Sequence, residues 1–351
     1  MQGIAFLGDR NVGLLAFPDP EPGIGEVVLQ MKASGICGTD LMLHRRPADA
    51  TQAPVIGGHE PCGIVAALGP GVDPARIKPG DRVMVHHYFG CAACEYCRSG
   101  WAQLCRSAPL KVYGNNVNGG HAPYLVVPAA TLIALPDELS FEAGAAISCG
   151  SGTAYAALRR LNVSGHDTVA IFGQGPVGLA ATQFAKALGA RVIALDISPR
   201  RLVRAAEFGA DVAIDPSASD AVAAIMDATG GRGADVIYDP VGGDVFDESV
   251  RCIAFDGRLL VVGFTSGRIP SVSVNMPLIK GFSVVGVRAG EYGRRFPARG
   301  AENAQAIWRL ADEGRIRPHV HAELPLERWR EAFDLLADRQ VIGKAVIRPD
   351  L

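Results

Sequence analysis

A glycine-rich junction between two apolar runs constrains the fold more than any other part of this sequence. The run TVAIF (168–172) is typical of a buried strand, and PVGLAATQFAKALG (176–189) has apolar residues at helical spacing. Gly173, Gly175 and Gly178 stand at the junction. Such glycines permit a tight turn, let the backbone approach a pyrophosphate and allow the helix to pack closely on the strand. The segment therefore predicts a dinucleotide-binding turn.

An acidic residue follows this turn at the spacing expected of an NAD-binding fold. The next strand, RVIAL (191–195), is followed by Asp196, which lies 23 residues after Gly173. A carboxylate there can bind both ribose hydroxyls of NAD and would repel the 2′-phosphate of NADP. An ordinary βα turn in a flavodoxin-like sheet is the alternative. The predicted cofactor-binding residues here are Gly173, Gly175, Pro176, Val177, Gly178 and Asp196.

The chain changes its pattern at about residue 150. Before that point, β-branched runs end at turn-forming residues, which predicts an irregular antiparallel barrel. These runs lie at 26–36, 62–71, 81–87 and 121–129. After it, strands alternate with helical stretches, which predicts a parallel sheet covered by helices on both faces. An amphipathic helix (301–316) and a final strand (344–349) come last.

Half of the eight cysteines stand in one stretch, CAACEYCRSGWAQLC. Cys91, Cys94, Cys97 and Cys105 form the pattern C-x2-C-x2-C-x7-C. Four thiolates from one loop can surround a zinc ion and leave no position for water or substrate, so we predict a structural zinc site. An iron–sulfur cluster and a chance group of free thiols are the alternatives. The irregular spacing and the lack of a following Cys-Pro fit a ferredoxin poorly.

Whole-chain composition limits the partners and the compartment. A formal net charge of −2 gives no basic footprint for nucleic acid. No apolar stretch approaches the roughly 20 residues that span a bilayer, and the N-terminus does not resemble a signal peptide. We therefore expect a cytoplasmic protein without nucleic-acid or membrane partners. Its thiols would stay reduced, so clustered cysteines indicate metal rather than disulfides.

A second set of possible metal ligands is dispersed along the chain. GICGTD contains Cys37 and Asp40, GGHEPCG contains His59 and Glu60, and AISCGSGTAY contains Cys149. Two thiolates and an imidazole would leave the fourth position of a zinc ion open, as a catalytic site requires. Each residue alone is more often a small buried thiol or an ordinary hydrogen-bonded imidazole.

Taken in order, these motifs resemble the zinc-containing medium-chain alcohol dehydrogenases over essentially the whole chain. The resemblance implies an α/β fold in which a Rossmann domain, with a doubly wound parallel sheet, interrupts a GroES-like catalytic domain built on an irregular β-barrel. We expect the catalytic domain at 1–149 and 291–351, with the structural zinc lobe at 90–106. The NAD-binding domain would occupy 150–290.

The resemblance also implies roles for individual residues. Cys37, His59 and Cys149 match the ligands of a catalytic zinc. Glu60 matches an acid that can approach the metal, and Asp40 a carboxylate that orients the ligand histidine. By the same matching, Thr39 would pass on the substrate proton, and Thr153 and Val262 would contact the nicotinamide. Arg201 would contact the adenosine ribose, and Lys344 would approach the cofactor.

Two departures from that family pattern stand out. The position of the usual relay histidine holds Met42, and His44, two residues on, is the candidate replacement. Segments of the C-terminal half also resemble the quinone oxidoreductase branch of the superfamily, which lacks zinc. His86, His87 and Tyr88 stand just before the cysteine stretch, either in the substrate pocket or as ordinary barrel residues.

The expected function is a reversible hydride transfer between an alcohol and NAD⁺, with two zinc ions per subunit, one catalytic and one structural. The substrate would be a small alcohol or carbonyl compound. A homodimer or homotetramer is expected, paired through the strand near 282–287. The alternatives are an NAD(P)H-dependent quinone or enone reductase and a non-enzymatic, zinc-stabilised NAD-binding protein.

Overall fold

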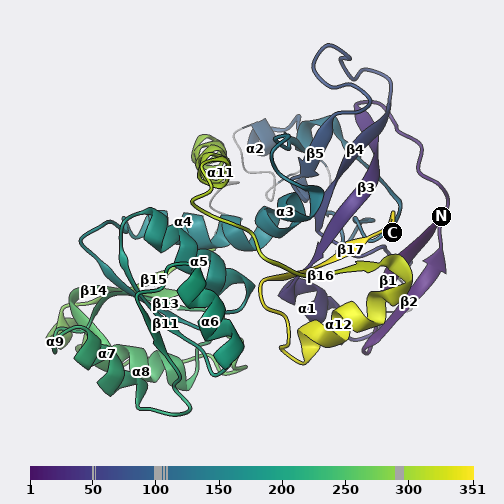
Figure 1. Cartoon of the computed structure of the whole chain (residues 1–351). Helices are drawn as coiled ribbons and strands as arrows, with labels where there is room; N and C mark the ends of the chain where they lie inside the picture. Colours follow the sequence, from purple (N-terminus) through teal and green to yellow (C-terminus); the bar gives the residue numbers. More distant parts are fainter. Residues whose placement is uncertain (50, 52, 99–104, 106, 108–109, 289–295) are drawn as a thin grey trace. The chain divides into compact units, whose positions relative to one another are not determined.

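The computed structural model describes residues 1–49, 51, 53–98, 105, 107, 110–288 and 296–351. The chain divides into two compact units (Figure 1). Met1–Cys149 and Pro318–Leu351 form the first unit, and Gly150–Arg317 forms the second. None of the helices in the described part of the chain combines the length and the apolar character that a bilayer span requires.

A seven-stranded sheet forms the first unit, in the order β16-β17-β3-β4-β5-β9, with β8 also pairing with β3. Its strands are β3 (Glu26–Ile36), β4 (Glu60–Leu68), β5 (Arg82–Val85), β8 (Tyr124–Pro128), β9 (Leu132–Ala134), β16 (Val320–Pro325) and β17 (Lys344–Arg348). Register shifts along β3 accompany its pairing with three strands, as β-bulges do in bent sheets. The sequence predicts an irregular antiparallel barrel, and the strand pairs of this sheet are antiparallel, except for the parallel pair β16–β17 at its edge.

Small elements surround that sheet. Two-stranded sheets are formed by β1 (Gln2–Gly8) with β2 (Asn11–Ala16), and by β6 (Tyr88–Phe89) with β7 (Lys111–Val112). The helices are α1 (Gly38–Arg45), α2 (Glu95–Arg98), η2 (Ala129–Thr131), α3 (Phe141–Ala146), η4 (Leu326–Arg328) and α12 (Trp329–Ala337). One apolar cluster joins β1, α1 and α12, and another fills the space between β3, β5 and β8.

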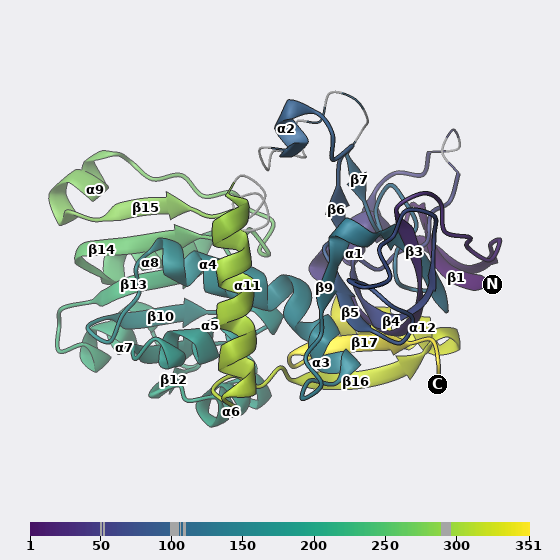
Figure 2. The same cartoon turned by 90° about the horizontal axis from the view of Figure 1, so that it is seen from above.

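The second unit is a six-stranded parallel sheet in the order β12-β11-β10-β13-β14-β15 (Figure 2). Its strands are β10 (Thr168–Phe172), β11 (Arg191–Leu195), β12 (Val212–Ile214), β13 (Ala234–Asp239), β14 (Ile253–Val261) and β15 (Ser283–Gly286). Its helices are α4 (Gly152–Arg160), α5 (Pro176–Ala187), α6 (Pro199–Glu207), α7 (Ala221–Ala228), α8 (Asp244–Cys252), α9 (Asn275–Lys280) and α11 (Pro297–Asp312). The strand order reverses between β10 and β13, which is where doubly wound sheets bind ligands.

The order of these elements explains most of the sequence pattern. Strand β10 and helix α5 begin where the glycine-turn motif predicts them, and Ala170 and Phe172 of β10 join an apolar core with the neighbouring strands. The chain returns to the first unit at Pro318, whereas the sequence places the return at residue 291. The residues around 291 lie outside the described part of the chain, but α11 packs on α4 and therefore belongs with the second unit.

One helical stretch is irregular. Between α3 and α4, residues Ile147–Ser151 form a π turn, in which each hydrogen bond closes a ring one residue longer than in an α-helix. Cys149 lies inside this turn. Turns of this kind inside α-helices occur frequently at functional sites.

Candidate metal centres and cofactor turn

The structure brings four predicted site residues of the first unit together. One ligand atom from each of Cys37, His59, Glu60 and Cys149 lies within 4.8 Å of the other three. We call these residues the Cys37 group. They come from the N-terminus of α1, the start of β4 and the π turn, so three separate parts of the chain converge on one point.

Asp40 lies against two members of this group. Its Oδ2 accepts a hydrogen bond from Cys37 N at 2.8 Å, which caps the N-terminus of α1. Its Oδ1 lies 3.6 Å from His59 Nδ1, and the Asp40 side chain is fully buried. The carboxylate therefore faces one nitrogen of the His59 ring and leaves Nε2 for another partner, as carboxylates beside metal-binding histidines do.

A buried ion pair borders the Cys37 group. Lys344 Nζ donates to Glu60 Oε1 at 2.7 Å, and the two residues are 3% and 0% exposed. Burial raises the pKa of the Glu60 carboxyl to about 7, although the nearby ammonium opposes the shift. Burial acts to lower the pKa of Lys344, but Glu60 and the two thiols outweigh it and raise that pKa. The sequence analysis did not predict this contact, because the family resemblance assigned Lys344 to the cofactor.

The pKa values of the two thiols in the Cys37 group are shifted in opposite directions. A hydrogen bond from Cys149 is the main cause that lowers the pKa of Cys37 well below its usual value. The same hydrogen bond, together with burial, raises the pKa of Cys149. The two shifts have opposite signs because the two sulfur atoms are joined by one hydrogen bond. A cation at this point would allow both thiols to ionise.

The donor set fits a zinc ion. Within the described part of the chain, His59 Nε2 and Glu60 Oε2 are buried atoms without a hydrogen-bond partner. Two sulfurs and one imidazole nitrogen are ligands that zinc accepts, and three such protein ligands leave the fourth position open, as in catalytic zinc sites. Glu60 lies beside them, and its Oε1 accepts from Lys344.

The second cysteine set also converges. The sulfur atoms of Cys91, Cys94, Cys97 and Cys105, which we call the Cys91 group, lie within 4.8 Å of one another. Cys91 Sγ accepts a hydrogen bond from Cys94 N at 3.2 Å and lies 3.7 Å from Cys97 Sγ. Backbone hydrogen bonds from Cys94 and Ala93 lower the pKa of Cys91 to about 6. Residues 99–104 and 106 of the predicted lobe lie outside the described residues.

The glycine turn follows β10, beside the point where the strand order reverses. Gly173 has a φ of +79° and donates its N–H to Leu195 O at 2.7 Å, which closes the turn on β11. A Cβ at Gly178 would collide with Gly173 O, so the helix approaches the turn as closely as glycine allows. Nothing lies within 4 Å of a Cβ placed on Gly175, and α5 begins at Pro176. This leaves an open helix N-terminus that fits a pyrophosphate.

Asp196 is tied to the same turn. Its Oδ2 accepts from Gln174 N at 2.6 Å, and its Oδ1 accepts from Ser198 N at 2.8 Å. The Arg201 guanidinium lies 3.6 Å from Oδ2. Carboxylate oxygens can each accept two hydrogen bonds, so ribose hydroxyls still have places on this side chain. The predicted Thr153 is the second residue of α4, and Val262 follows β14 and donates its N–H to Asp239 O at 2.9 Å.

The predicted proton-relay residues lie on α1. Thr39 stands in the first turn beside Cys37 and is partly buried, whereas the Met42 side chain is 71% exposed. His44 Nε2 lies 2.7 Å from Arg10 O, so the ring is held at the β1–β2 hairpin. The His87 ring lies 5.2 Å from the His59 ring and 4.1 Å from the Tyr88 ring, measured between centroids. This places His87 next to the Cys37 group.

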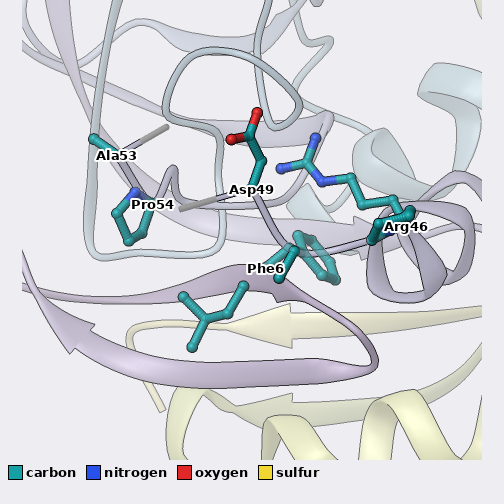
Figure 3. Close-up of a pocket in the computed structure, with 8 residues that line it drawn as sticks. Phe6, Arg46, Asp49, Ala53 and Pro54 are labelled. Atoms are coloured by element: carbon teal, nitrogen blue, oxygen red, sulfur yellow. The ribbon is translucent and has the colours of Figure 1, made fainter. Parts of the chain in front are cut away.

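A cavity elsewhere on the first unit is separate from these sites. It is lined by Phe6, Leu7, Arg46, Pro47, Ala48, Asp49, Ala53 and Pro54. Figure 3 shows the ends of the Arg46 and Asp49 side chains pointing toward each other across it. None of the predicted site residues lines this cavity.

Comparisons with known proteins agree with the two-unit fold. Residues 23–137 match the alcohol dehydrogenase GroES-like domain, and residues 176–305 match the zinc-binding dehydrogenase domain. An alcohol dehydrogenase of Geobacillus stearothermophilus is 33% identical over 335 residues, which is 94% of each chain. A solved NAD-dependent alcohol dehydrogenase is 31% identical and superposes with a TM-score of 0.86 over 99% of both chains.

Two further relatives have names other than alcohol dehydrogenase. The uncharacterized zinc-type alcohol dehydrogenase-like protein YphC of Escherichia coli (strain K12) is 45% identical over 211 residues, 58% of this chain and 59% of YphC. The acryloyl-coenzyme A reductase of Metallosphaera sedula is 29% identical over 94% of each chain.

A GroES-like sheet unit combined with a parallel-sheet unit that carries a glycine turn defines an α/β oxidoreductase. The chain belongs to the zinc-type medium-chain dehydrogenase/reductase family. The resemblance noted from the motifs and the predicted fold class are thereby confirmed.

Proposed function

We propose that the protein is a zinc-dependent alcohol dehydrogenase that exchanges a hydride reversibly between an alcohol and NAD⁺. The observation that carries the proposal is the convergence of two thiols, an imidazole and a carboxylate in the Cys37 group. When bound, zinc would lower the pKa of an alcohol oxygen, and the nicotinamide of NAD⁺ would accept the hydride. The Cys91 group would hold a second, structural zinc.

The residues around the Cys37 group would orient the ligand histidine, balance charge and carry the substrate proton. Asp40, whose Oδ1 lies 3.6 Å from His59 Nδ1, would hold the His59 ring so that Nε2 faces the ligand position. Lys344 binds Glu60 and balances its negative charge in a buried place. Thr39, next but one after Cys37, would take the alcohol proton at its hydroxyl and pass it toward solvent.

The glycine turn would hold the cofactor. The open N-terminus of α5 would face the pyrophosphate of NAD, and the close approach of Gly173 and Gly178 keeps side chains out of its way. Asp196 would accept the hydroxyls of the adenosine ribose. The carboxylate favours NAD over NADP because a 2′-phosphate would meet a negative charge.

A second candidate is an NAD(P)H-dependent reductase of a conjugated carbonyl or quinone. The similarity to an acryloyl-coenzyme A reductase favours it, because that relative matches the chain along nearly its whole length. In such an enzyme the Cys37 group would be incidental to turnover. Loss of its metal would then leave the reduction rate intact.

One set of assays separates these functions. Purified wild type and Cys149→Ser would be tested with NAD⁺ on aliphatic, aromatic and polyhydroxy alcohols, and with NADH and NADPH on aldehydes, enones and quinones. We expect wild type to oxidise at least one alcohol class and Cys149→Ser to lose that activity while still binding NAD. Enone or quinone reduction that survives Cys149→Ser would favour the reductase. A folded, NAD-binding wild type without any turnover would favour a non-enzymatic role.

A further inference from the structure

One side chain of the glycine turn is buried inside the second unit. Gln174 lies between Gly173 and Gly175 and is 0% exposed. Its Nε2 donates a hydrogen bond to Ile171 O at 3.0 Å, and its Oε1 accepts one from Thr182 Oγ1 at 2.9 Å. The carbonyl of Ile171 can only accept, so the orientation of the amide is fixed. Glutamine is mostly an exposed residue in proteins, and its complete burial at this turn therefore indicates a role.

Thr182 makes an unusual hydrogen bond for a threonine inside a helix. A buried hydroxyl in a helix commonly donates to the carbonyl four residues earlier, as Ser249 does to Val245 O at 2.7 Å. Thr182 is 0% exposed on α5 and donates instead to the side chain of Gln174, eight residues earlier. A side-chain hydrogen bond therefore connects the helix to the turn that precedes it.

The backbone of Gln174 extends this connection to the next strand. Its N–H donates to Asp196 Oδ2 at 2.6 Å, directly after β11. The hydrogen bonds of one residue thus join the end of β10, the helix α5 and the acid that follows β11. In the proposed function the last two hold the cofactor, because the pyrophosphate would face the N-terminus of α5 and the ribose would bind Asp196.

The two neighbours of Gln174 explain why the turn needs this connection. Gly173 has a φ of +79°, and apart from its chain neighbours no described atom lies within 4 Å of a Cβ placed on Gly175. Glycine loses more backbone freedom on ordering than any other residue. A turn with two glycines would therefore sample several shapes unless the residue between them is fixed. Gln174 is fixed at its amide oxygen, its amide nitrogen and its backbone N–H.

We propose that Gln174 and Thr182 are positioning residues, which hold the glycine turn in the shape that NAD binds before NAD arrives. The inference rests on the proposed NAD-dependent function. Such preorganisation strengthens binding, because a ligand binds more weakly when only a fraction of the protein has the competent shape. Both side chains are fully buried, so they act through the turn and not by contact with the cofactor.

Two substitutions of Thr182 separate the hydroxyl from the shape of the side chain. Thr182→Val keeps the shape and removes the donor, so Gln174 Oε1 loses its partner. We expect Thr182→Val to bind NADH about tenfold more weakly in a fluorescence titration, as it would if the turn were competent about a tenth of the time. Thr182→Ser keeps the hydroxyl and should bind NADH nearly as tightly as the wild type, although its lost methyl group lowers the melting temperature.

Gln174 gives a second test of the same connection. Gln174→Met has a side chain of similar length, lacks both hydrogen-bonding atoms of the amide and retains the backbone N–H that donates to Asp196. We expect it to weaken NADH binding by about the same factor as Thr182→Val. The double variant Gln174→Met/Thr182→Val should bind NADH no more weakly than either single variant, because the two side chains act as one unit.

Hydrogen exchange distinguishes positioning from a general loss of stability. Without ligand, the peptide that spans 173–178 should exchange faster in Thr182→Val than in the wild type, and saturating NADH should remove most of the difference. Ser249 is a buried hydroxyl of the same unit whose hydrogen bond stays within α8. Ser249→Ala should therefore lower the melting temperature without changing NADH affinity or the exchange of this peptide.

The positioning role is refuted if Thr182→Val binds NADH as tightly as the wild type, or if Thr182→Val and Thr182→Ser lose the same affinity. Unchanged exchange of the peptide in ligand-free Thr182→Val would refute it as well. If Gln174→Met does not fold, Thr182→Val gives the decision as the smaller change. A wild type that binds no NADH would instead refute the proposed function, and the positioning role with it.

Discussion

Asp196 makes two structural hydrogen bonds besides its predicted contact with the cofactor. Its carboxylate accepts backbone hydrogen bonds from Gln174 and Ser198, so an alanine there would loosen the turn as well as remove the charge. Asp196→Asn is the better test because it keeps acceptor capacity. We expect kcat/KM with NAD⁺ to fall about tenfold and the preference for NAD over NADP to narrow, since one charged hydrogen bond is lost. A wild type that already prefers NADP would contradict the assignment.

Thr39 and Met42 give a matched pair on one helix. Thr39→Val keeps the shape of the side chain and removes the hydroxyl, so kcat should fall about 100-fold if the proton leaves by this route. Met42→His introduces the histidine that the family usually has at this position, which is 71% exposed in this chain. We expect kcat to change little near neutral pH, because another exit already operates. Steady-state kinetics on both variants decide the matter, and an unimpaired Thr39→Val would exclude the relay.

Single residues show where sequence reading succeeds and where it stops. The convergence of Cys37, His59 and Cys149 could be expected because their motifs, taken in order, match one family, although each motif alone is a weak signal. The Lys344–Glu60 ion pair joins residues 284 positions apart, and no local pattern indicates it.

The two metal groups are built on different elements, so their mutations should have different effects. Cys94→Ser alters the closed four-sulfur group and should lower the melting temperature and the zinc content. Its folded fraction should keep most of its kcat per bound NAD. Cys149→Ser alters the Cys37 group, so turnover should collapse while fold and NAD binding survive. Metal analysis, thermal melts and kcat together decide this. Turnover lost only in a folded Cys94→Ser would mean that the two roles are reversed.

The elements themselves follow the sequence closely where one period dominates. The run at 26–36 matches β3, and TVAIF matches β10, because both are bounded by turn-forming residues. The run at 81–87 forms only the four residues of β5, since His86 and His87 continue as irregular chain. The parallel pairing of β16 with β17 could not be predicted, because register depends on partners that are remote in sequence.

The edge of the second sheet is the expected site of assembly into a dimer or tetramer. Strand β15 is the edge of the second sheet, and Val274, Leu278 and Ile279 at helix α9 are 85%, 82% and 69% exposed. Exposed apolar groups of this kind mark interaction surfaces, so we expect a dimer or tetramer formed at this edge. Light scattering should show that Leu278→Glu lowers the mass. Ile24→Glu, at an 86% exposed site in the first unit, is the control. A wild type that is monomeric would contradict this prediction.

The Cys37 group depends on chain length, because Cys149 stands on a helical stretch that continues from α3. Successive residues of an α-helix are rotated by about 100°, so loss of one codon between Phe141 and Ile147 would shift the sulfur by that angle around the helix axis. Such a deletion would leave every ligand residue in the gene and still remove one ligand from the site. Relatives that have lost the metal could therefore differ from this chain by a missing residue here rather than by a replaced cysteine.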